Sequence, residues 1–310
     1  MPGKFEYRYP SVNGKNEIYS LRWEAEKPVA VLQIIHGMQE FVDRYDDFAN
    51  YLSSKGYVVV GEDHLGHGFS VNDESEYGYF GKTGSEDVLK DIRQLHEKTK
   101  AEYPDLPYFF LGHSMGSFLV RQYIERWGED VDGVIIMGTG WTDQPVLTAG
   151  KFVCNLIGAF KGEKHRSGTV EKIAFGSYNE RFPKRTRVDW LSKDEKIVDT
   201  YLKEPRCTFR FTLNGYKFLF NAIEDEQKNI AKIPKDLPVF FVSGEQDPVG
   251  AYGKGVITSC TKFKEAGMTD VNIKLYPDDR HEILNELDRE KVYEDLYNWL
   301  ENKRKITLGK

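Results

Sequence analysis

Short apolar runs alternate with amphipathic stretches along the first half of the chain. The runs are rich in Val, Ile and aromatic residues, and Gly or Pro stands close to their ends. Strands that are buried on both faces of a parallel sheet have this pattern. We therefore expect strands at 29–35, 57–60, 108–111 and 134–137. Apolar positions at helical spacing among charged ones predict helices at 44–55, 85–102 and 114–127.

This alternation of strands and helices predicts a doubly wound α/β fold, and residues 5–9 and 18–23 predict an edge hairpin before it. The alternation stops near Gly140. It returns with a strand at 239–242, a helix at 252–266, a strand at 271–276 and a long helix at 282–303. We divide the chain into an α/β core (1–140 and 231–310) and an inserted cap (141–230). Insertions at this place usually cover the carboxyl ends of the strands, where open α/β sheets bind ligands.

Composition narrows the class of protein further. The chain has 310 residues, 40% hydrophobic and 14% aromatic, which is typical of a globular protein of this length. The net charge of −6 disfavours a nucleic-acid partner. The three cysteines are widely spaced and predict no disulfide framework. The polar start of the chain and the lack of a long apolar run lead us to expect a soluble, cytoplasmic protein.

The strongest chemical signal is the pentapeptide Gly112-His113-Ser114-Met115-Gly116. It matches the pattern G-x-S-x-G and stands directly between a predicted strand and a predicted helix. In that context a sharp turn exposes the serine hydroxyl, and the helix N-terminus faces it with free N–H groups. The five-residue pattern alone is common, so a glycine-rich turn with a bystander serine is the alternative. The strand and helix on either side favour a nucleophile at Ser114.

A serine hydroxyl needs a base, and the base needs a carboxylate to orient it. His281 follows the strand at 271–276 and precedes the last predicted helix, which makes it the best candidate for the base. Asp247 follows the strand at 239–242 and is our choice for the carboxylate, with Glu245 as its competitor. The chain order Ser114, Asp247, His281 is that of α/β-hydrolases.

The oxyanion of such a reaction needs two N–H donors. We expect them from Met115, directly after the nucleophile, and from Met38 in the loop that follows the strand at 29–35. A second cluster, Asp63-His64-Leu65-Gly66-His67-Gly68, could bind a metal. No further ligands stand at a helpful spacing, so a structural glycine-rich loop is the favoured interpretation.

Several of these motifs together resemble one family. They are His36-Gly37-Met38, Asp63-His64-x-Gly66-His67-Gly68-x-Ser70, Gly112 to Gly116, Asp247 and His281. This set resembles the monoacylglycerol lipase and lysophospholipase branch of the α/β-hydrolases, nearly end to end. The resemblance implies an α/β-hydrolase fold with a mostly parallel sheet, helices on both faces and an inserted cap. It also implies a serine hydrolase that cleaves fatty acyl esters with a small polar head through an acyl-enzyme, without a cofactor or metal.

The resemblance extends to substrate contacts. It implies that Glu40, Arg44 and His113 contact the polar head and that the cap holds an apolar tunnel for the acyl chain. Candidate walls of this tunnel, which could equally be packed core, are Phe152, Leu156, Ile157, Phe160 and Phe175. Two positions depart from the family, and both bear on the head group. Gln39 replaces a small residue, and Leu284 replaces a histidine that is often found in members that cleave monoacylglycerol.

Other functions stay open at this point. The same catalytic residues serve carboxylesterases and thioesterases for shorter or aromatic acyl groups. A serine peptidase or a non-catalytic ligand-binding protein is less favoured. The expected partner is a small acyl ester. The cap could contact a membrane surface transiently, although its sequence shows no long apolar stripe, and the oligomeric state does not follow from the sequence.

Overall fold

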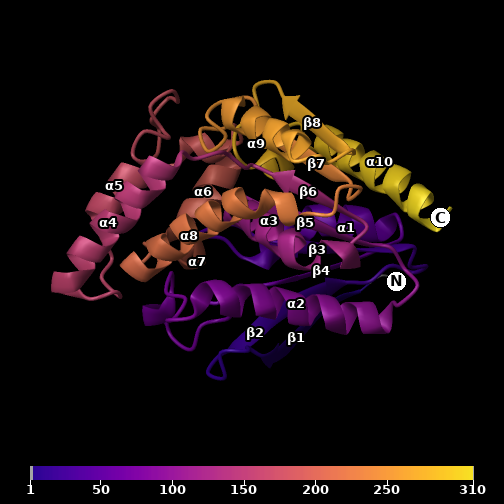
Figure 1. Cartoon of the computed structure of the whole chain (residues 1–310), viewed down its shortest axis with the longest axis horizontal. Coiled ribbons are helices and arrows are strands. Elements are labelled where there is room, and N and C mark those ends of the chain that lie inside the picture. The colour runs from indigo at the N-terminus through magenta and orange to yellow at the C-terminus, as the bar shows by residue number, and fades with distance from the viewer. Residues whose placement is uncertain (1–2, 310) are drawn as a thin grey trace.

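An eight-stranded sheet runs through the middle of the computed structural model, which describes residues 3–309 (Figure 1). The strands lie in the order β1-β2-β4-β3-β5-β6-β7-β8. Strands β1 and β2 form the antiparallel edge, β4 pairs antiparallel to β2, and all later pairs are parallel. In chain order, their bounds are Lys4–Pro10 (β1), Glu17–Trp23 (β2), Ala30–Ile35 (β3), Tyr57–Glu62 (β4), Tyr108–His113 (β5), Gly133–Met137 (β6), Val239–Gly244 (β7) and Val271–Tyr276 (β8). The mostly parallel α/β sheet and its edge hairpin are thereby confirmed.

The five strands from β3 to β7 consist of buried residues alone. Helices cover both faces of these strands, so neither face can carry polar residues without loss of stability. This explains why the strands read as continuous apolar runs in the sequence. Strand β8 lies at the edge and exposes several of its side chains, which is why its sequence alternates more.

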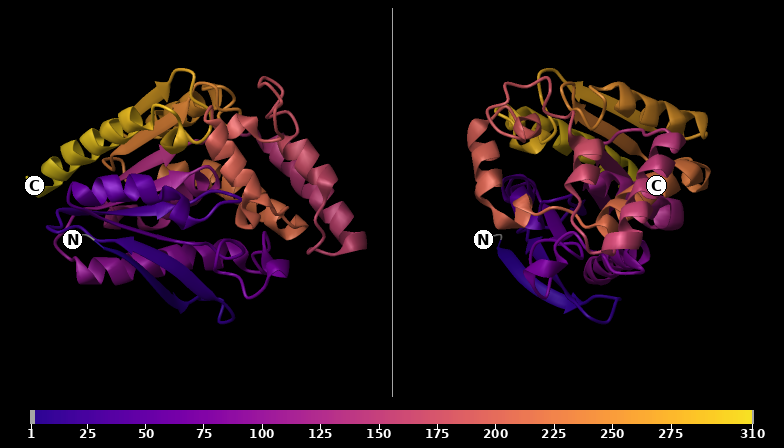
Figure 2. Two further views of the ribbon diagram at one scale, coloured as in Figure 1. Left: turned by 180° about the vertical axis from the view of Figure 1, so that it is seen from behind. Right: turned by 90° about the vertical axis from the view of Figure 1, so that its left-hand side faces the viewer.

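Two helical layers enclose the sheet (Figure 2). Helices α1 (Asp46–Ser54) and α10 (Arg289–Leu308) pack on one face, where Phe48, Leu52 and Leu296 are buried. The opposite face is covered by α2 (Gly84–Glu102), α3 (Met115–Trp127) and α9 (Lys254–Glu265). Burial of these apolar faces is the main favourable contribution to the free energy of folding.

The chain between β6 and β7 is helical. It forms α4 (Gln144–Lys161), α5 (Gly168–Phe175), α6 (Glu195–Lys203), α7 (Pro205–Thr208) and α8 (Leu213–Asn229). Helix α8 packs against α3, and the buried side chains of Arg121 and Glu226 form an ion pair between them. Helices α4 and α5 project at the end of the molecule opposite the two termini (Figure 1). Within residues 3–309, no helix combines the length and apolar character that crossing a bilayer would require.

The last helix differs from the prediction. It begins at Arg289, not at residue 282, and continues to Leu308. The intervening residues form a loop with one short 3-10 turn, η6 (Ile283–Asn285). The buried Glu286 carboxylate explains this loop, since it accepts hydrogen bonds from the backbone N–H groups of Arg280 and Lys193. The helix predicted at 44–55 likewise begins later, after the 3-10 turn η1 (Val42–Tyr45).

Candidate active site

Ser114 occupies the turn between β5 and α3. Its backbone has φ 54° and ψ −120°, a left-handed conformation that is rare for residues other than glycine. Helix α3 begins at the next residue, so the side chain of Ser114 stands at the positive end of the helix dipole. Backbone strain of this kind persists only where the surroundings enforce it.

The two glycines of the motif explain how the turn is enforced. A Cβ atom on Gly116 would lie 2.0 Å from the carbonyl oxygen of Ile35, at the end of β3. A Cβ atom on Gly112 would lie 2.4 Å from the carbonyl oxygen of Gly116. Only glycine at both positions lets α3 turn back this closely against the sheet, so the spacing of the motif follows from steric exclusion.

His281 and Asp247 form a buried pair. The Nδ1 atom of His281 lies 2.9 Å from Oδ2 of Asp247, and both side chains are almost inaccessible to solvent. The other carboxylate oxygen of Asp247 accepts the backbone N–H of Val249 at 2.8 Å. The competing acid, Glu245, is exposed. With Nδ1 held by the carboxylate, Nε2 is the nitrogen of His281 that is left for proton transfer.

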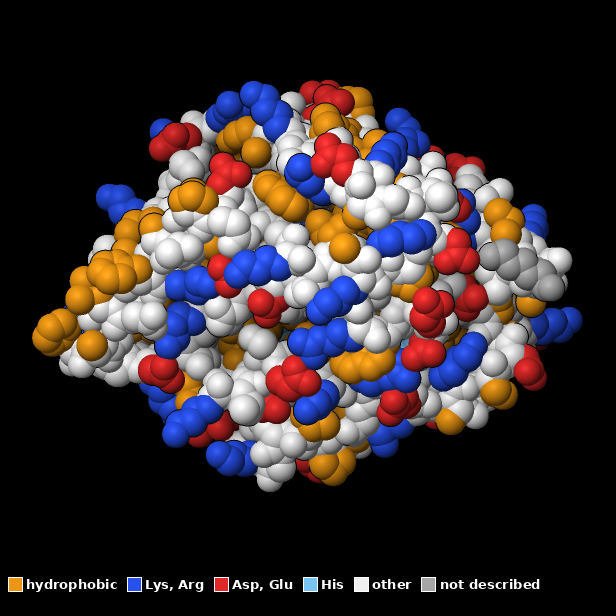
Figure 3. All heavy atoms as spheres, viewed as in Figure 1, with side chains coloured by type: hydrophobic (Ala, Val, Ile, Leu, Met, Phe, Trp, Pro, Cys, Tyr) orange, Lys and Arg blue, Asp and Glu red, His pale blue; other side chains and the backbone are white. Residues whose placement is uncertain are grey.

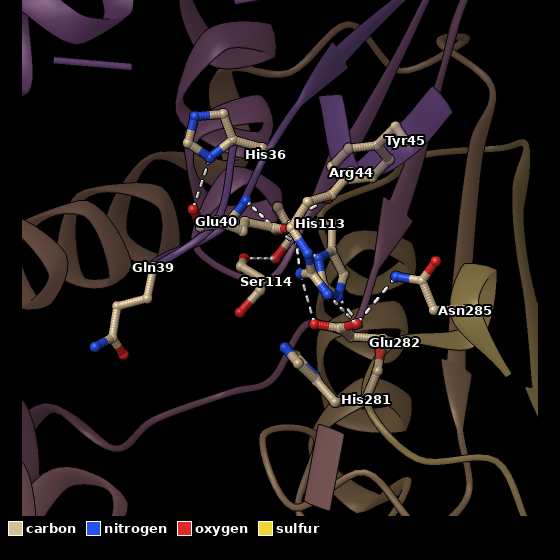
Figure 4. A network of polar contacts seen from close by, with 12 residues as sticks. His36, Gln39, Glu40, Arg44, Tyr45, His113, Ser114, His281, Glu282 and Asn285 are labelled. Carbon is tan, nitrogen blue, oxygen red and sulfur yellow. Dashed lines mark hydrogen bonds and ion pairs between the residues drawn. The ribbon is translucent and has the colours of Figure 1, made fainter. Parts of the chain in front are cut away.

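Ser114 and His281 line the same cavity (Figure 4). Because Asp247 is bound to His281, the structure brings the three residues of the expected triad to one place. Within the described chain no hydrogen bond joins the two side chains directly. Such contacts are often long before substrate binds and tighten in the complex.

The two expected oxyanion donors flank the same cavity. Met115 is the first residue of α3, and Met38 lies in the loop after β3. Among residues 3–309, neither backbone N–H donates a hydrogen bond to another group of the chain. Both groups are therefore free to bind an oxygen atom in the cavity.

A histidine holds the loop of Met38 in place. Gln39 has φ 58°, and its backbone N–H donates to Nε2 of His67 at 3.2 Å. The Nδ1 atom of His67 lies 3.2 Å from the carbonyl oxygen of Leu65, so the ring is neutral with its proton on Nδ1. Burial lowers the pKa of His67 to about 3, which agrees with that tautomer. Gln39 itself points away from the triad, and its amide donates to the carbonyl of Phe209 (Figure 4).

The Asp63 cluster ties neighbouring loops together. The Asp63 carboxylate accepts the backbone N–H groups of Val42 and Phe69, each at 2.8 Å. The backbone N–H of His64 donates to His36 Nε2 at 3.0 Å. Within residues 3–309, no group of three or more His, Cys, Asp or Glu side chains is arranged to hold a metal ion. These contacts agree with the structural interpretation of the cluster.

Glu40, Arg44 and His113, which the resemblance assigns to the polar head, bind one another. Glu40 Oε1 lies 2.9 Å from His113 Nδ1, and Glu40 Oε2 lies 3.2 Å from the Arg44 guanidinium. Burial acts to raise the pKa of Glu40, but the charges of His113 and Arg44 outweigh it, and the pKa lies below its ordinary value. Glu40 and His113 line the cavity, whereas Arg44 lies behind it.

The cavity is bounded by the core on one side and by helices from the segment between β6 and β7 on the other. Its apolar lining consists mainly of Phe118, Phe175, Tyr178, Trp190, Leu191, Leu219, Ile223 and Val249. Of the five residues proposed as tunnel walls, only Phe175 lines this cavity. Phe152, Leu156 and Phe160 are 66%, 52% and 85% exposed. Their helical spacing places these three together on the outer side of α4, so those three assignments are wrong. Ile157 packs against the core, which is the alternative that the sequence left open for it.

The sequence interpretation missed Glu282 and Trp190. Glu282 lines the cavity, and both of its carboxylate oxygens accept hydrogen bonds from Arg44, at 2.8 and 2.7 Å. The ring of Trp190 lies 5.1 Å from that of His281, between centroids. The position of Glu282 directly after His281 was a usable signal. Nothing in the local sequence marks Trp190.

Comparisons with known proteins find a matching family and several relatives. The family model described as serine aminopeptidase, S33, matches residues 26–288. The monoglyceride lipase homolog of Monkeypox virus is 39% identical over 292 residues, covering 93% of this chain and 95% of that protein. The monoacylglycerol lipase of Mycolicibacterium smegmatis is 24% identical over 302 residues, covering 95% and 96%.

Solved structures show the same architecture. A thermostable carboxyl esterase from Bacillus coagulans, in complex with glycerol, superposes with a TM-score of 0.90 and 30% identity. The match covers 98% of this chain and 100% of the esterase. The predicted α/β-hydrolase fold is therefore confirmed.

Proposed function

Because the chain belongs to the serine aminopeptidase S33 family of α/β-hydrolases, we propose that it is a serine hydrolase acting on fatty acyl esters with a small polar head. One observation carries the proposal: the strained turn of Ser114 and the buried His281–Asp247 pair face one apolar cavity. The relatives named as monoacylglycerol lipases support this substrate class.

The residues have the following roles in the proposed reaction. The Oγ atom of Ser114 attacks the ester carbonyl carbon while His281 Nε2 takes its proton, and Asp247 stabilises the imidazolium. The N–H groups of Met38 and Met115 bind the oxyanion. Loss of one such donor typically lowers the rate about 100- to 1000-fold.

The tetrahedral intermediate then collapses. The ester C–O bond breaks, His281 returns the proton to the leaving alcohol, and the acyl group stays on Ser114. Water next attacks the acyl-enzyme with His281 as base, and the fatty acid leaves as the serine hydroxyl is restored. No cofactor takes part in either step.

We place the acyl chain in the apolar cavity and propose that residues 141–230 act as its cap. Phe175, Tyr178 and Leu219 come from this segment, and Phe118 comes from α3. An apolar wall of this kind binds an alkyl chain through the hydrophobic effect, at roughly 25 cal/mol for each Å² removed from water.

The charges of the cavity favour an uncharged head group such as glycerol over a phosphate. Glu40 and Glu282 line the cavity, and its described lining contains no Lys or Arg side chain. The nearby Arg44 already donates to both carboxylates. A lysophospholipid phosphate would therefore approach two carboxylates whose partners are already bound to them, without a free Lys or Arg side chain to neutralise the phosphate.

This proposal predicts a head-group preference. Purified protein should release fatty acid from a monoacylglycerol at least tenfold faster, in kcat/KM, than from a lysophosphatidylglycerol of the same acyl chain, whose head group carries a net negative charge. A p-nitrophenyl ester series from acetate to palmitate measures the acyl preference in parallel. Faster cleavage of the lysophospholipid would contradict the charge argument, and a preference for acetate would favour a carboxylesterase instead.

A transient membrane contact through α4 would bring such substrates to the cavity. Phe152, Leu156 and Phe160 form an exposed apolar stripe on this helix, and Ile173 of α5 is also exposed. Apolar side chains gather on the end of the molecule formed by these helices (Figure 3). Exposed apolar patches of this kind commonly mark interaction sites.

The cytoplasmic location stays a prediction from the sequence.

A further inference from the structure

His113, the residue before the proposed nucleophile, lies between two acceptor atoms (Figure 4). Its Nδ1 atom is 2.9 Å from Glu40 Oε1, and its Nε2 atom is 3.3 Å from the carbonyl oxygen of His281. A neutral imidazole carries one N–H group and would turn a lone pair toward one of these acceptors. We propose that His113 is a doubly protonated imidazolium that binds Glu40 and the His281 carbonyl at once and thereby positions the catalytic base.

The proposal requires that Glu40 is ionised for reasons other than His113. Three other donors surround its carboxylate. The backbone N–H of Gly37 and the hydroxyl of Tyr45 donate to Oε1, and the Arg44 guanidinium donates to Oε2. A carboxylate that accepts several hydrogen bonds, one of them from a guanidinium, strongly favours its charged form. Glu40 is therefore an acceptor toward His113.

The charges around His113 favour its cationic form. Three carboxylates face it from the loops after β3, β7 and β8, and the other groups nearby are the Arg44 guanidinium on η1, which opposes a charge on His113, and the ring of His281. These carboxylates are Glu40, Asp247 and Glu282. Burial acts to lower the pKa of His113, but the charge and hydrogen bond of Glu40 outweigh it, so the pKa is raised.

Close packing keeps the two histidines together. The rings of His113 and His281 lie 4.6 Å apart between centroids. Gly138, just after β6, has φ 59°, and a Cβ atom there would lie 3.1 Å from both rings. The absence of a side chain at this position leaves the space that the two rings fill.

His281 is thus held at two points. Asp247 binds its imidazole, and His113 binds its backbone carbonyl. When His113 loses a proton at alkaline pH, one of its two hydrogen bonds is lost and the second anchor weakens. This positioning role rests on the proposed function. It predicts that kcat declines at alkaline pH as His113 loses its proton.

The charge itself can be measured without turnover. Nuclear magnetic resonance of protein labelled with ¹⁵N-histidine reports the protonation of each ring, and the His113→Phe variant assigns the signal. At pH 7, His113 should show two protonated nitrogens. His96 is the matched control, because burial lowers the pKa of this α2 histidine to about 4, and it should be neutral. A neutral His113 at pH 7 would overturn the proposal.

Kinetics test the positioning role. Glu40→Gln removes the charge that favours the imidazolium, so the alkaline decline in kcat should move to lower pH. His113→Phe should lower kcat about 100-fold with a smaller change in KM, as expected when a reacting group is displaced. His113→Gln, which keeps one donor, should recover part of this loss. If the alkaline decline in kcat of Glu40→Gln lies at the same pH as in the wild type, the positioning role of His113 is refuted. A wild type without esterase activity would refute the proposed function alone.

Discussion

Glu62, the last residue of β4, is a carboxylate whose surroundings favour its neutral form. It has no exposed surface, and burial raises its pKa to about 8. The hydroxyl of Tyr9 on β1 donates to one of its oxygens. The other oxygen lies 3.5 Å from Nδ1 of His64, and neither atom has a hydrogen-bond partner among residues 3–309. A proton on the carboxyl group would lie between these two atoms.

This environment predicts a pH-dependent stability. Between an ordinary glutamate pKa and pH 8, the unfolded chain releases the Glu62 proton while the folded chain keeps it. The free energy of unfolding should therefore fall as pH rises, with a contribution from this residue of about 1.4 kcal/mol per pH unit. Glu62→Gln, which mimics the protonated carboxyl, should remove that contribution between pH 5 and 8, measured by urea unfolding.

Other buried acids titrate as well, so the difference between the variant and the wild type is the diagnostic quantity. Glu62→Ala is the control. It removes the carboxylate acceptor of the buried Tyr9 hydroxyl, which keeps only a 3.4 Å contact to the carbonyl oxygen of Asp91, and it should destabilise the protein at acidic pH too. If the free energy of unfolding of Glu62→Gln falls with pH as steeply as that of the wild type, Glu62 is ionised in the folded protein.

Single residues also show which parts of the site can be predicted from the sequence and which cannot. The G-x-S-x-G spacing follows from steric exclusion at Gly112, against Gly116, and at Gly116, against the end of β3. Both glycines stand within two residues of the serine, so a short motif was sufficient to find Ser114. The bond between Arg44 and Glu282 joins residues 238 positions apart and depends on how two loops meet. No local pattern encodes such a contact, so the bond to Arg44 could not be predicted, although the place of Glu282 directly after His281 was a usable signal for the residue itself.

At the scale of elements, burial determined which strands and helix ends could be predicted from the sequence. Strands between two helical layers are mostly apolar, and the prediction found each of them from β3 to β7. The residues before α10 have helix-compatible spacing, but Glu286 is bound by the backbone N–H of Lys193 and Glu282 by Arg44, both from distant parts of the chain. Those tertiary contacts outweigh local helix propensity, which explains the late start at Arg289.

Helix α4 is a second case in which tertiary packing could not be predicted from the local sequence pattern. Its apolar positions were read as tunnel walls, because periodicity shows that a helix has an apolar face without showing what that face meets. In the structure Phe152 and Phe160 face outward, and the cavity is lined by Phe175 and by residues of α8. The direction of a helical face is decided by the packing of the whole segment.

At the scale of the whole molecule, the outward face of α4 predicts binding to lipid vesicles. Replacing Phe152, Leu156 and Phe160 with Gln should lower the fraction bound to phosphatidylcholine vesicles at least tenfold. Burial of one large apolar side chain contributes roughly 1.5–3 kcal/mol. Hydrolysis of a short soluble ester should stay within twofold of wild type, since these side chains do not line the cavity. Flotation of vesicles measures the bound fraction.

Two exposed apolar residues of α10, Ile306 and Leu308, provide the matched control at the other end of the molecule. Their replacement with Gln should leave vesicle binding unchanged. Equal loss of binding in both variants would show that the effect is not specific to α4.

The whole fold brings Ser114, Asp247 and His281 from three separate loops to one place beside the cavity, and we claim that this convergence makes the Ser114 hydroxyl reactive. Covalent labelling with a fluorophosphonate, followed by peptide mass spectrometry, tests it most directly. Wild-type protein should carry one adduct on Ser114. Ser114→Ala should carry none and hydrolyse no ester, although its circular dichroism spectrum stays that of the wild type. An adduct on another residue, or ester hydrolysis that survives in Ser114→Ala, would contradict the claim.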